Sequence, residues 1–145
     1  MTRFLQEVLE YHHQLNDELI DKMTEYGLGG EIKRLFSHML NAHNIWNARI
    51  NEIGVTITAW ETHSLETCQV MNDMNYNITK DILSNSKLDQ VIKYVNLSGQ
   101  AYSNKIEEII FHILNHHTHH RAQITLEFRK QGYDPMDTDF ISRKR

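Results

Sequence analysis

Cysteine, proline and long hydrophobic runs are nearly absent from this chain of 145 residues. The single cysteine, Cys68, excludes a disulfide framework within the chain and fits a reducing compartment, so we expect a cytoplasmic protein. No apolar run approaches the roughly 20 residues that a membrane-spanning helix needs, and we expect no membrane insertion. One proline and six glycines leave few helix breakers, which favours long helices.

Neither sign of charge dominates the composition. The chain has 15 Lys and Arg against 19 Asp and Glu, for a net charge of −4 with histidine neutral. No basic face follows from that balance, so we expect no nucleic-acid partner. Hydrophobic residues make up 40% of the chain, enough at this length for one core. We therefore expect residues 1–145 to form a single domain.

Apolar residues recur at helical spacing in four long segments. These segments are about 2–26, 31–53, 65–83 and 104–131. Gly54 is expected to end the second helix and Gly132 to cap the last. The pattern predicts an all-α four-helix bundle, with Trp46 and Trp60 in its core.

Two stretches between these helices are long enough to carry a crossover connection, residues 54–64 and 88–103. The second stretch alternates weakly between apolar and polar residues and contains Ser-Gly, which predicts a short two-stranded ribbon before the last helix. The C-terminal tail, residues 134–145, has a mixed composition and is expected to pack loosely.

Histidine is abundant, and half of the ten histidines lie in the run FHILNHHTHHRAQI. Helical periodicity places His112, His116 and His120 on one face at i, i+4 and i+8, with Gln123 beside them. An i, i+4 histidine pair is a common metal-binding geometry on a helix. Several imidazoles on an inward face would be costly without partners, and a shared cation would satisfy them. The pattern therefore favours a metal pair, His116 and His120, over ordinary core or surface histidines.

The neighbouring histidines His117 and His119 point to either side of His116. We interpret them as residues around the metal, as dimer contacts or as solvated side chains. A catalytic site of this kind wants a third protein ligand and an open position. The candidates for the third ligand are His12, His13, His38 and His43.

Periodicity prefers His12 or His43 as the third ligand, because both lie in the middle of an apolar stripe. The alternative for each is a hydrogen-bonded core histidine. Asn16 lies on the same stripe as His12 and also needs a partner.

The segment SHMLNAHNIWNARI, followed far downstream by HILNHHTHHRAQI, resembles the DinB (damage-inducible) family, which includes YfiT-like and bacillithiol-transferase-like proteins. The resemblance extends to YHHQLN in the first helix and to the tail. It implies an up-down-down-up bundle with a three-histidine divalent-metal site. The first ligand would be the histidine eight residues before the tryptophan of the second helix, here His38 before Trp46. The other two would be His116 and His120, and we keep His43 as second choice to His38.

The resemblance also implies thiol-dependent chemistry, with the metal stabilising the thiolate of a low-molecular-weight cosubstrate. The alternative is a non-catalytic metal-binding stress-response or scaffold protein. Three imidazoles favour zinc or nickel, with iron and copper as alternatives. No catalytic residue is assigned. The residues expected around the metal or against the substrate are His12, Asn16, His43, His112, Arg121 and Gln123.

We also expect a homodimer. Phe36, Trp46 and the predicted ribbon would leave apolar surface exposed on a bundle of this size, and members of the resembled family commonly dimerise.

Overall fold

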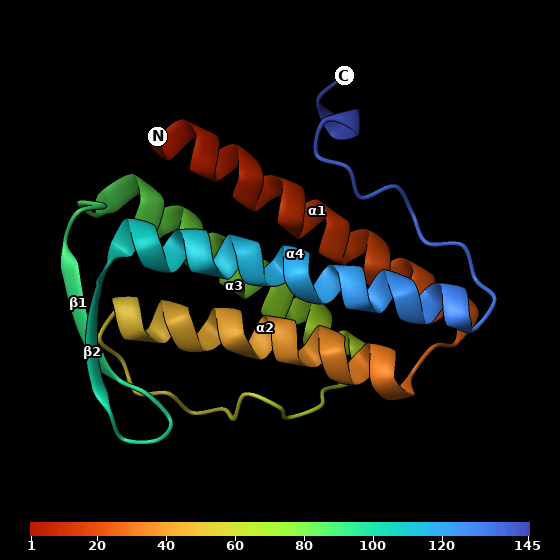
Figure 1. The fold of residues 1–145 in the computed structure, drawn as a ribbon, viewed down its shortest axis with the longest axis horizontal. Coiled ribbons are helices and arrows are strands. Elements are labelled where there is room, and N and C mark those ends of the chain that lie inside the picture. Colours follow the sequence, from red (N-terminus) through yellow and green to blue (C-terminus); the bar gives the residue numbers. More distant parts are fainter.

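Four long helices and a two-stranded ribbon make up the computed structural model, which describes residues 1–145 (Figure 1). The helices are α1 (Thr2–Tyr26), α2 (Gly30–Ile50), α3 (Leu65–Asn85) and α4 (Ile106–Lys130). The strands β1 (Val91–Val95) and β2 (Ala101–Lys105) pair antiparallel between α3 and α4, and a 3-10 turn, η1, spans Ser142–Lys144. None of the helices has the length and apolarity needed to cross a membrane.

The helices run up, down, down and up, as the resemblance implied. Figure 1 shows α1 and α4 running in one direction and α2 and α3 in the other. A short turn joins α1 to α2, and the connector of residues 51–64 runs back along the bundle so that α3 starts parallel to α2. Helix α1 packs on α3, and α2 packs on both α3 and α4. The predicted all-α bundle and the ribbon before the last helix are therefore confirmed.

The end of α2 differs from the prediction, because Gly54 does not terminate it. The helix ends at Ile50, and Glu52 adopts a left-handed φ of 56°. The N–H of Ile53 then donates to the carbonyl of Ala48 at 3.0 Å, the closing bond of a Schellman motif. Glycine usually occupies this left-handed position. Because Glu52 stands there instead, the residue types do not indicate that the helix ends at this point.

The ends of the other helices follow their local sequence. Gly27 closes α1 with a φ of 64°, and its N–H faces the carbonyls of Met23 and Thr24. The Ser64 hydroxyl accepts the N–H of Thr67 at 3.2 Å and so caps α3.

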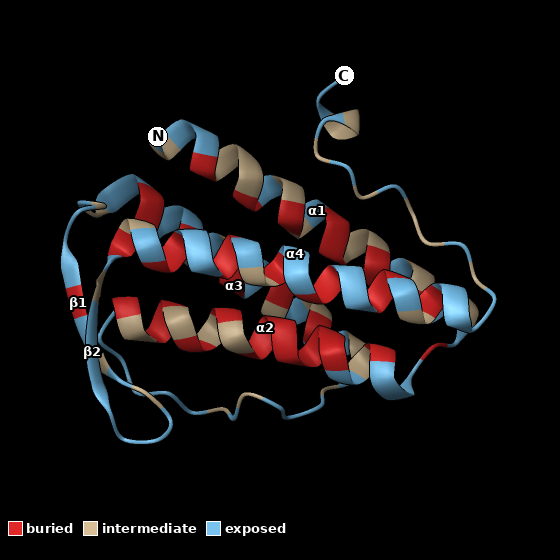
Figure 2. Ribbon diagram, in the orientation of Figure 1, coloured by how far each residue is buried: buried red, intermediate tan, exposed pale blue.

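Two separate apolar clusters form the core. One lies toward the α1–α2 turn and is centred on Phe36 and Phe128, and the other lies toward the ribbon and is centred on Ile110 and Ile113. Between them lies a set of buried polar side chains, which we call the polar layer: His12, Asn16, His43, Asn47, Asn72, Asn75, Thr79, His117 and Arg121. Figure 2 shows that each helix carries buried residues along the side facing its neighbours.

The C-terminal tail packs specifically, which corrects the expectation of loose packing. Arg143 forms two hydrogen bonds to the Glu18 carboxylate, at 2.6 and 2.7 Å. Phe140 lies edge-on to the rings of Tyr11 and Phe4, with centroids 5.1 and 6.2 Å away. An arginine fork on a carboxylate and an aromatic contact hold the tail against α1.

Two phenylalanines on α4 test this description of the core. Phe128 is 0% exposed and Phe111 is 64% exposed. We expect Phe128→Ala to lower the free energy of unfolding by about 3–5 kcal/mol, because it removes a ring from a packed cluster. Phe111→Ala should change it by less than about 0.5 kcal/mol. Urea unfolding followed by circular dichroism measures both, and equal losses would contradict the assigned packing of α4.

Candidate metal centre

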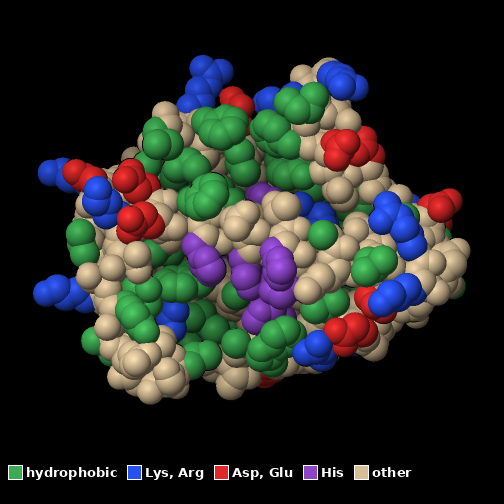
Figure 3. Space-filling view, in the orientation of Figure 1, with side chains coloured by type: hydrophobic (Ala, Val, Ile, Leu, Met, Phe, Trp, Pro, Cys, Tyr) green, Lys and Arg blue, Asp and Glu red, His purple; other side chains and the backbone are tan.

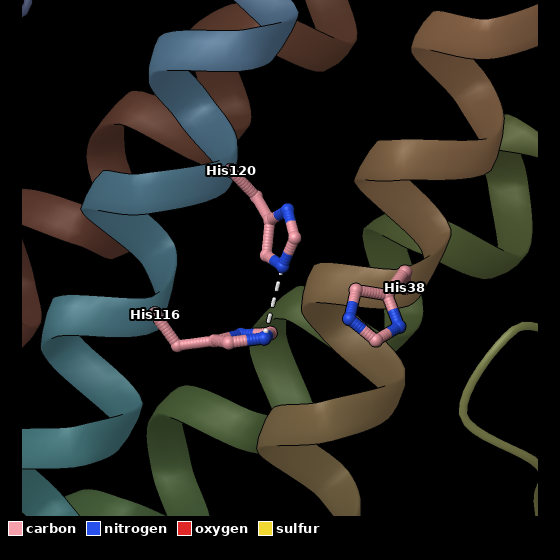
Figure 4. A group of neighbouring side chains, drawn as sticks. All are labelled: His38, His116 and His120. Carbon is pink, nitrogen blue, oxygen red and sulfur yellow. Dashed lines mark hydrogen bonds between the residues drawn. The ribbon is translucent and has the colours of Figure 1, made fainter.

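Three histidines from two helices meet between α2 and α4. His38 projects from α2, and His116 and His120 project from successive turns of α4 (Figure 4). One ring nitrogen from each lies within 4.8 Å of the others. The i, i+4 spacing on α4 accounts for two of the three, and the packing of α2 on α4 supplies the third.

Hydrogen bonds fix how two of the rings present their nitrogens. The Nδ1 of His38 lies 2.7 Å from the Ala59 carbonyl, and the Nδ1 of His120 lies 2.7 Å from Oε1 of Gln123. Both partners are acceptors, so each Nδ1 carries the proton and each Nε2 keeps its lone pair. The Nε2 of His120 lies 3.0 Å from the Nε2 of His116. Histidines that ligate metals are oriented by outer hydrogen bonds of this kind.

The three imidazoles are held neutral. Burial, with smaller contributions from the neighbouring His120 and His38, lowers the pKa of His116 to about 3. Burial also lowers the pKa of His38 and of His120. Neutral imidazoles have the lone pairs that a cation requires, so the donor set fits a divalent metal.

Trp60 covers His38 instead of lying in the core, which corrects the sequence-based expectation. The two rings stack at 3.6 Å between centroids with an angle of 7°, and Trp60 is 48% exposed. The Arg34 guanidinium lies over the tryptophan ring, 4.5 Å from its centroid. One face of the His38 ring is thereby shielded by a cation–π stack.

The connector that carries Trp60 is anchored to α2 by one buried amide. The Nδ2 of Asn41 donates to the carbonyls of Ala59 and Glu61, at 3.3 and 2.7 Å. Its Oδ1 lies 2.6 Å from the Nε2 of His63. The sequence contains no metal-ligand pattern in this connector, so neither the carbonyl partner of His38 nor the tryptophan cover could be recognised from it.

The two histidines that periodicity preferred as third ligand lie elsewhere, in the polar layer. The Nδ1 of His43 is 3.0 Å from the Nε2 of His117, and its Nε2 is 2.8 Å from the Thr79 hydroxyl. His12 accepts from the Arg121 guanidinium, 2.6 Å from its Nδ1. These histidines are hydrogen-bonded core residues, the alternative that the sequence left open.

The remaining candidates divide between the polar layer and the metal centre. Arg121 is buried against His12 and the Tyr11 ring and does not line the three-histidine group. His117 is buried and therefore not solvated, whereas His119 is exposed. Asn16 faces His117, with its Nδ2 3.4 Å from Nδ1.

Two residues lie directly beside the metal centre. Gln123 bonds His120, and the ring of His112 lies 5.8 Å from that of His116 and 5.3 Å from that of Trp46.

A second group of potential ligands occurs on the opposite helices. His13 and Asp17 on α1 and Asp73 on α3 also have ligand atoms within 4.8 Å of one another. The His13 Nε2 lies 2.8 Å from an Asp73 oxygen, an ordinary surface histidine–carboxylate pair. The Asp17 carboxylate also accepts from the side-chain amides of Gln69 and Asn72, at 2.8 and 2.9 Å, so the protein itself occupies its hydrogen-bonding positions.

The three-histidine group opens to the surface. Figure 3 shows histidine side chains gathered in the middle of the face that α2 and α4 form. No acidic or cysteine side chain joins the group, since Cys68 is buried in the core near Ser37. Three neutral imidazole nitrogens are a ligand set that catalytic zinc sites use, so the group could hold a metal ion.

Comparison with models of known protein families identifies the family of the chain. The DinB family model matches residues 5–145, nearly the whole chain. A search of curated proteins finds no significant relative.

Acid should unfold the metal-free protein through the polar layer. Burial lowers the pKa of His12 to about 2, with Arg121 adding to the shift, and burial lowers the pKa of His43 to about 3. In the unfolded chain both values return to 6.5. The unfolded state therefore binds more protons below pH 6.5, and stability falls as the pH drops from there towards 3. Each histidine contributes about 2 kcal/mol of loss between about pH 7.5 and pH 5.

Urea titrations in chelator at a series of pH values measure this loss. His12→Gln keeps an acceptor for Arg121 but removes the titrating ring, so its stability should fall less steeply with acid. His119→Gln changes an exposed histidine on α4 and should retain the wild-type slope. A wild-type slope in His12→Gln would contradict a neutral, buried His12.

Proposed function

Because the chain belongs to the DinB family, we propose that it binds a divalent metal ion and catalyses thiol-dependent group transfer. The proposed ligands are His38, His116 and His120, in one domain that spans residues 1–145. The observation that supports this most strongly is the pair of Nδ1 hydrogen bonds, from His38 to Ala59 and from His120 to Gln123, which leaves the Nε2 lone pairs of both rings free within the three-histidine group.

Zinc or nickel is the metal we propose, with iron and copper as alternatives, because imidazole donors suit all four. When bound, such a cation would lower the pKa of a thiol at its open position and supply a nucleophile at neutral pH. The proposed cosubstrate is a low-molecular-weight thiol.

The protein's own residues would orient and shield the site. The Ala59 carbonyl and Gln123 hold the rings of His38 and His120 in a fixed tautomer and direction. Trp60 covers His38 and limits the approach of water from that side. Arg121, considered from the sequence as a substrate contact, lies inside the bundle and joins α4 to α1 instead.

An open site supports an enzyme over a metal-binding scaffold. A structural metal site is closed by a fourth protein ligand. The two histidines that could have filled that place, His12 and His43, are engaged with Arg121, His117 and Thr79. A metal-loaded protein without thiol transfer would favour the non-catalytic stress-response or scaffold alternative.

Metal analysis of purified variants tests the ligand set. His116→Ala and His120→Ala should lose the metal, whereas His119→Ala, an exposed neighbour on the same helix, should keep one ion per chain. Gln123→Ala should weaken metal affinity by about 10–100-fold, because it frees the His120 ring. Equal metal content in all four variants would contradict the assignment.

A thiol-transfer assay tests the reaction. Metal-loaded protein with a cellular thiol and an alkylating electrophile should form the thioether faster than the metal-stripped protein. His120→Ala should match the metal-stripped rate, and His119→Ala should match wild type. Identical rates with and without metal would exclude the proposed reaction.

We also propose a homodimer in the cytoplasm. Phe36 is fully buried and cannot contribute to an interface, but Val91, Val95, Leu97 and Tyr102 of the ribbon region are exposed. A two-stranded ribbon has open outer edges, and with exposed apolar side chains it is a surface that a second copy of the chain could cover. The lone free thiol of Cys68 fits a reducing compartment.

Light scattering at tens of micromolar should give the mass of two chains. Replacing Val95 and Leu97 by Asp should shift the mass to that of one chain, because charge is costly in an apolar interface. A wild-type mass of one chain would contradict the dimer.

A further inference from the structure

A cavity of about 270 Å³ lies beside the three histidines, toward the ribbon. It is lined by Trp46, Tyr94, Asn104, Glu108, Ile109 and His112. We call it the aromatic pocket. Figure 3 shows the surface hollowed on the ribbon side of the histidines, with hydrophobic side chains in the hollow. Its volume lies just below the range of about 300–1,000 Å³ that is typical of drug-sized ligands, which suits a single-ring molecule.

The aromatic pocket and the metal centre share a wall. His112 lies one helical turn before His116, with ring centroids 5.8 Å apart, and also faces Trp46 at 5.3 Å. A molecule in the pocket therefore contacts the ring next to a proposed metal ligand.

The pocket walls are held in place without a ligand. The rings of Trp46 and Tyr94 meet edge-to-face at 5.1 Å and 80°. The guanidinium of Arg49 lies 4.5 Å from the first ring centroid and 5.0 Å from the second. The Tyr94 hydroxyl donates to Asn104 at 2.7 Å. A pocket with fixed walls loses little side-chain entropy when it binds.

Glu108 is the one charged residue among those that line the pocket, and the Arg49 guanidinium lies against the Trp46 and Tyr94 rings without lining it. The backbone N–H of Lys105 donates to the Glu108 carboxylate at 2.9 Å and the Asn104 amide at 3.2 Å. Those bonds stabilise the ionised form, and the pKa of Glu108 is lowered accordingly. A fixed negative charge disfavours anions in the pocket, while the aromatic walls favour flat apolar rings.

We propose that the aromatic pocket binds the planar aromatic body of the electrophile, uncharged or cationic, and places its reactive carbon beside the metal centre. The role of the bound molecule as the electrophile rests on the proposed function, whereas its binding in the pocket does not. In the transfer, the thiol sulfur forms a bond to that carbon. The bond from the carbon to its leaving group breaks, the leaving group departs with the electron pair, and the thiol proton passes to water.

Tryptophan fluorescence can isolate this pocket, because the chain has two tryptophans. Trp60→Phe keeps an aromatic ring over His38 and leaves Trp46 as the only reporter. The probes are 4-nitrobenzyl alcohol, 4-nitrobenzylamine and 4-nitrobenzoate, which share one ring and differ in charge. The alcohol and the amine should quench Trp46 saturably, and the benzoate should bind at least about tenfold more weakly.

Second-site variants in the same background test the walls. Tyr94→Leu should weaken binding of the alcohol about tenfold, because it removes an aromatic wall. Glu108→Gln keeps the side-chain acceptor that caps α4 but removes its charge. It should therefore reduce the difference in affinity between the amine and the benzoate. Phe111→Leu, on α4 but outside the pocket, should bind as its parent does.

The outcomes separate this proposal from the metal-dependent function. Metal-stripped protein should still bind the alcohol, because none of the three proposed ligands lines the pocket. Saturable quenching by a protein that takes up no divalent metal even when metal is supplied would support the pocket and reject the proposed reaction. Absence of saturable quenching in a folded, metal-loaded protein would overturn the pocket alone. If Tyr94→Leu leaves the affinity for the alcohol unchanged, the assigned aromatic wall is wrong. If Glu108→Gln leaves the difference in affinity between the amine and the benzoate unchanged, the assigned charge is wrong.

Discussion

The packing of α2 against α4 is the constraint on which the rest of the molecule depends, because the three histidines come from these two helices. His116 and His120 share a face through helical periodicity alone, but His38 joins them only if the two helices hold one register and rotation. The apolar clusters around Phe36 and Ile110 fix that register from both sides. If α2 slipped by one helical turn along α4, the His38 nitrogen would move by about 5 Å, too far to share a cation with His116 and His120.

Hydrogen bonds in the polar layer also fix how α2 and α4 lie relative to each other. Apolar packing tolerates small shifts, whereas hydrogen bonds between buried groups require particular partners. His43 of α2 meets His117 of α4, and Thr79 of α3 binds the other side of the same imidazole. The His43 ring thus joins three helices, two of which carry the three-histidine group. Burial lowers the pKa of His43 to about 3 and so keeps this ring neutral. His43 is therefore a hydrogen-bonded core residue rather than a metal ligand.

Sequence patterns predicted the helices, the ribbon and the pair His116 and His120, whereas the family resemblance implied the up-down-down-up order and the choice of His38 over His12 and His43. They did so because helical periodicity, capping residues and a family motif are local signals. The end of α2 at Ile50 with a left-handed Glu52 after it, the stacking of Trp60 on His38 and the hydrogen bonds of the polar layer were missed. Each of these depends on contacts between segments far apart in the chain, or on a residue in a backbone conformation that its type rarely adopts.

The central claim is that His38, His116 and His120 share one cation, and anomalous X-ray diffraction tests it most directly. Crystals of the metal-loaded protein, measured above and below the absorption edge of the metal found by elemental analysis, should show one anomalous peak per chain. We expect that peak about 2.0–2.3 Å from a ring nitrogen of each histidine. A peak at His13, Asp17 and Asp73, or no peak between α2 and α4 in a protein that retains its metal, would contradict the account.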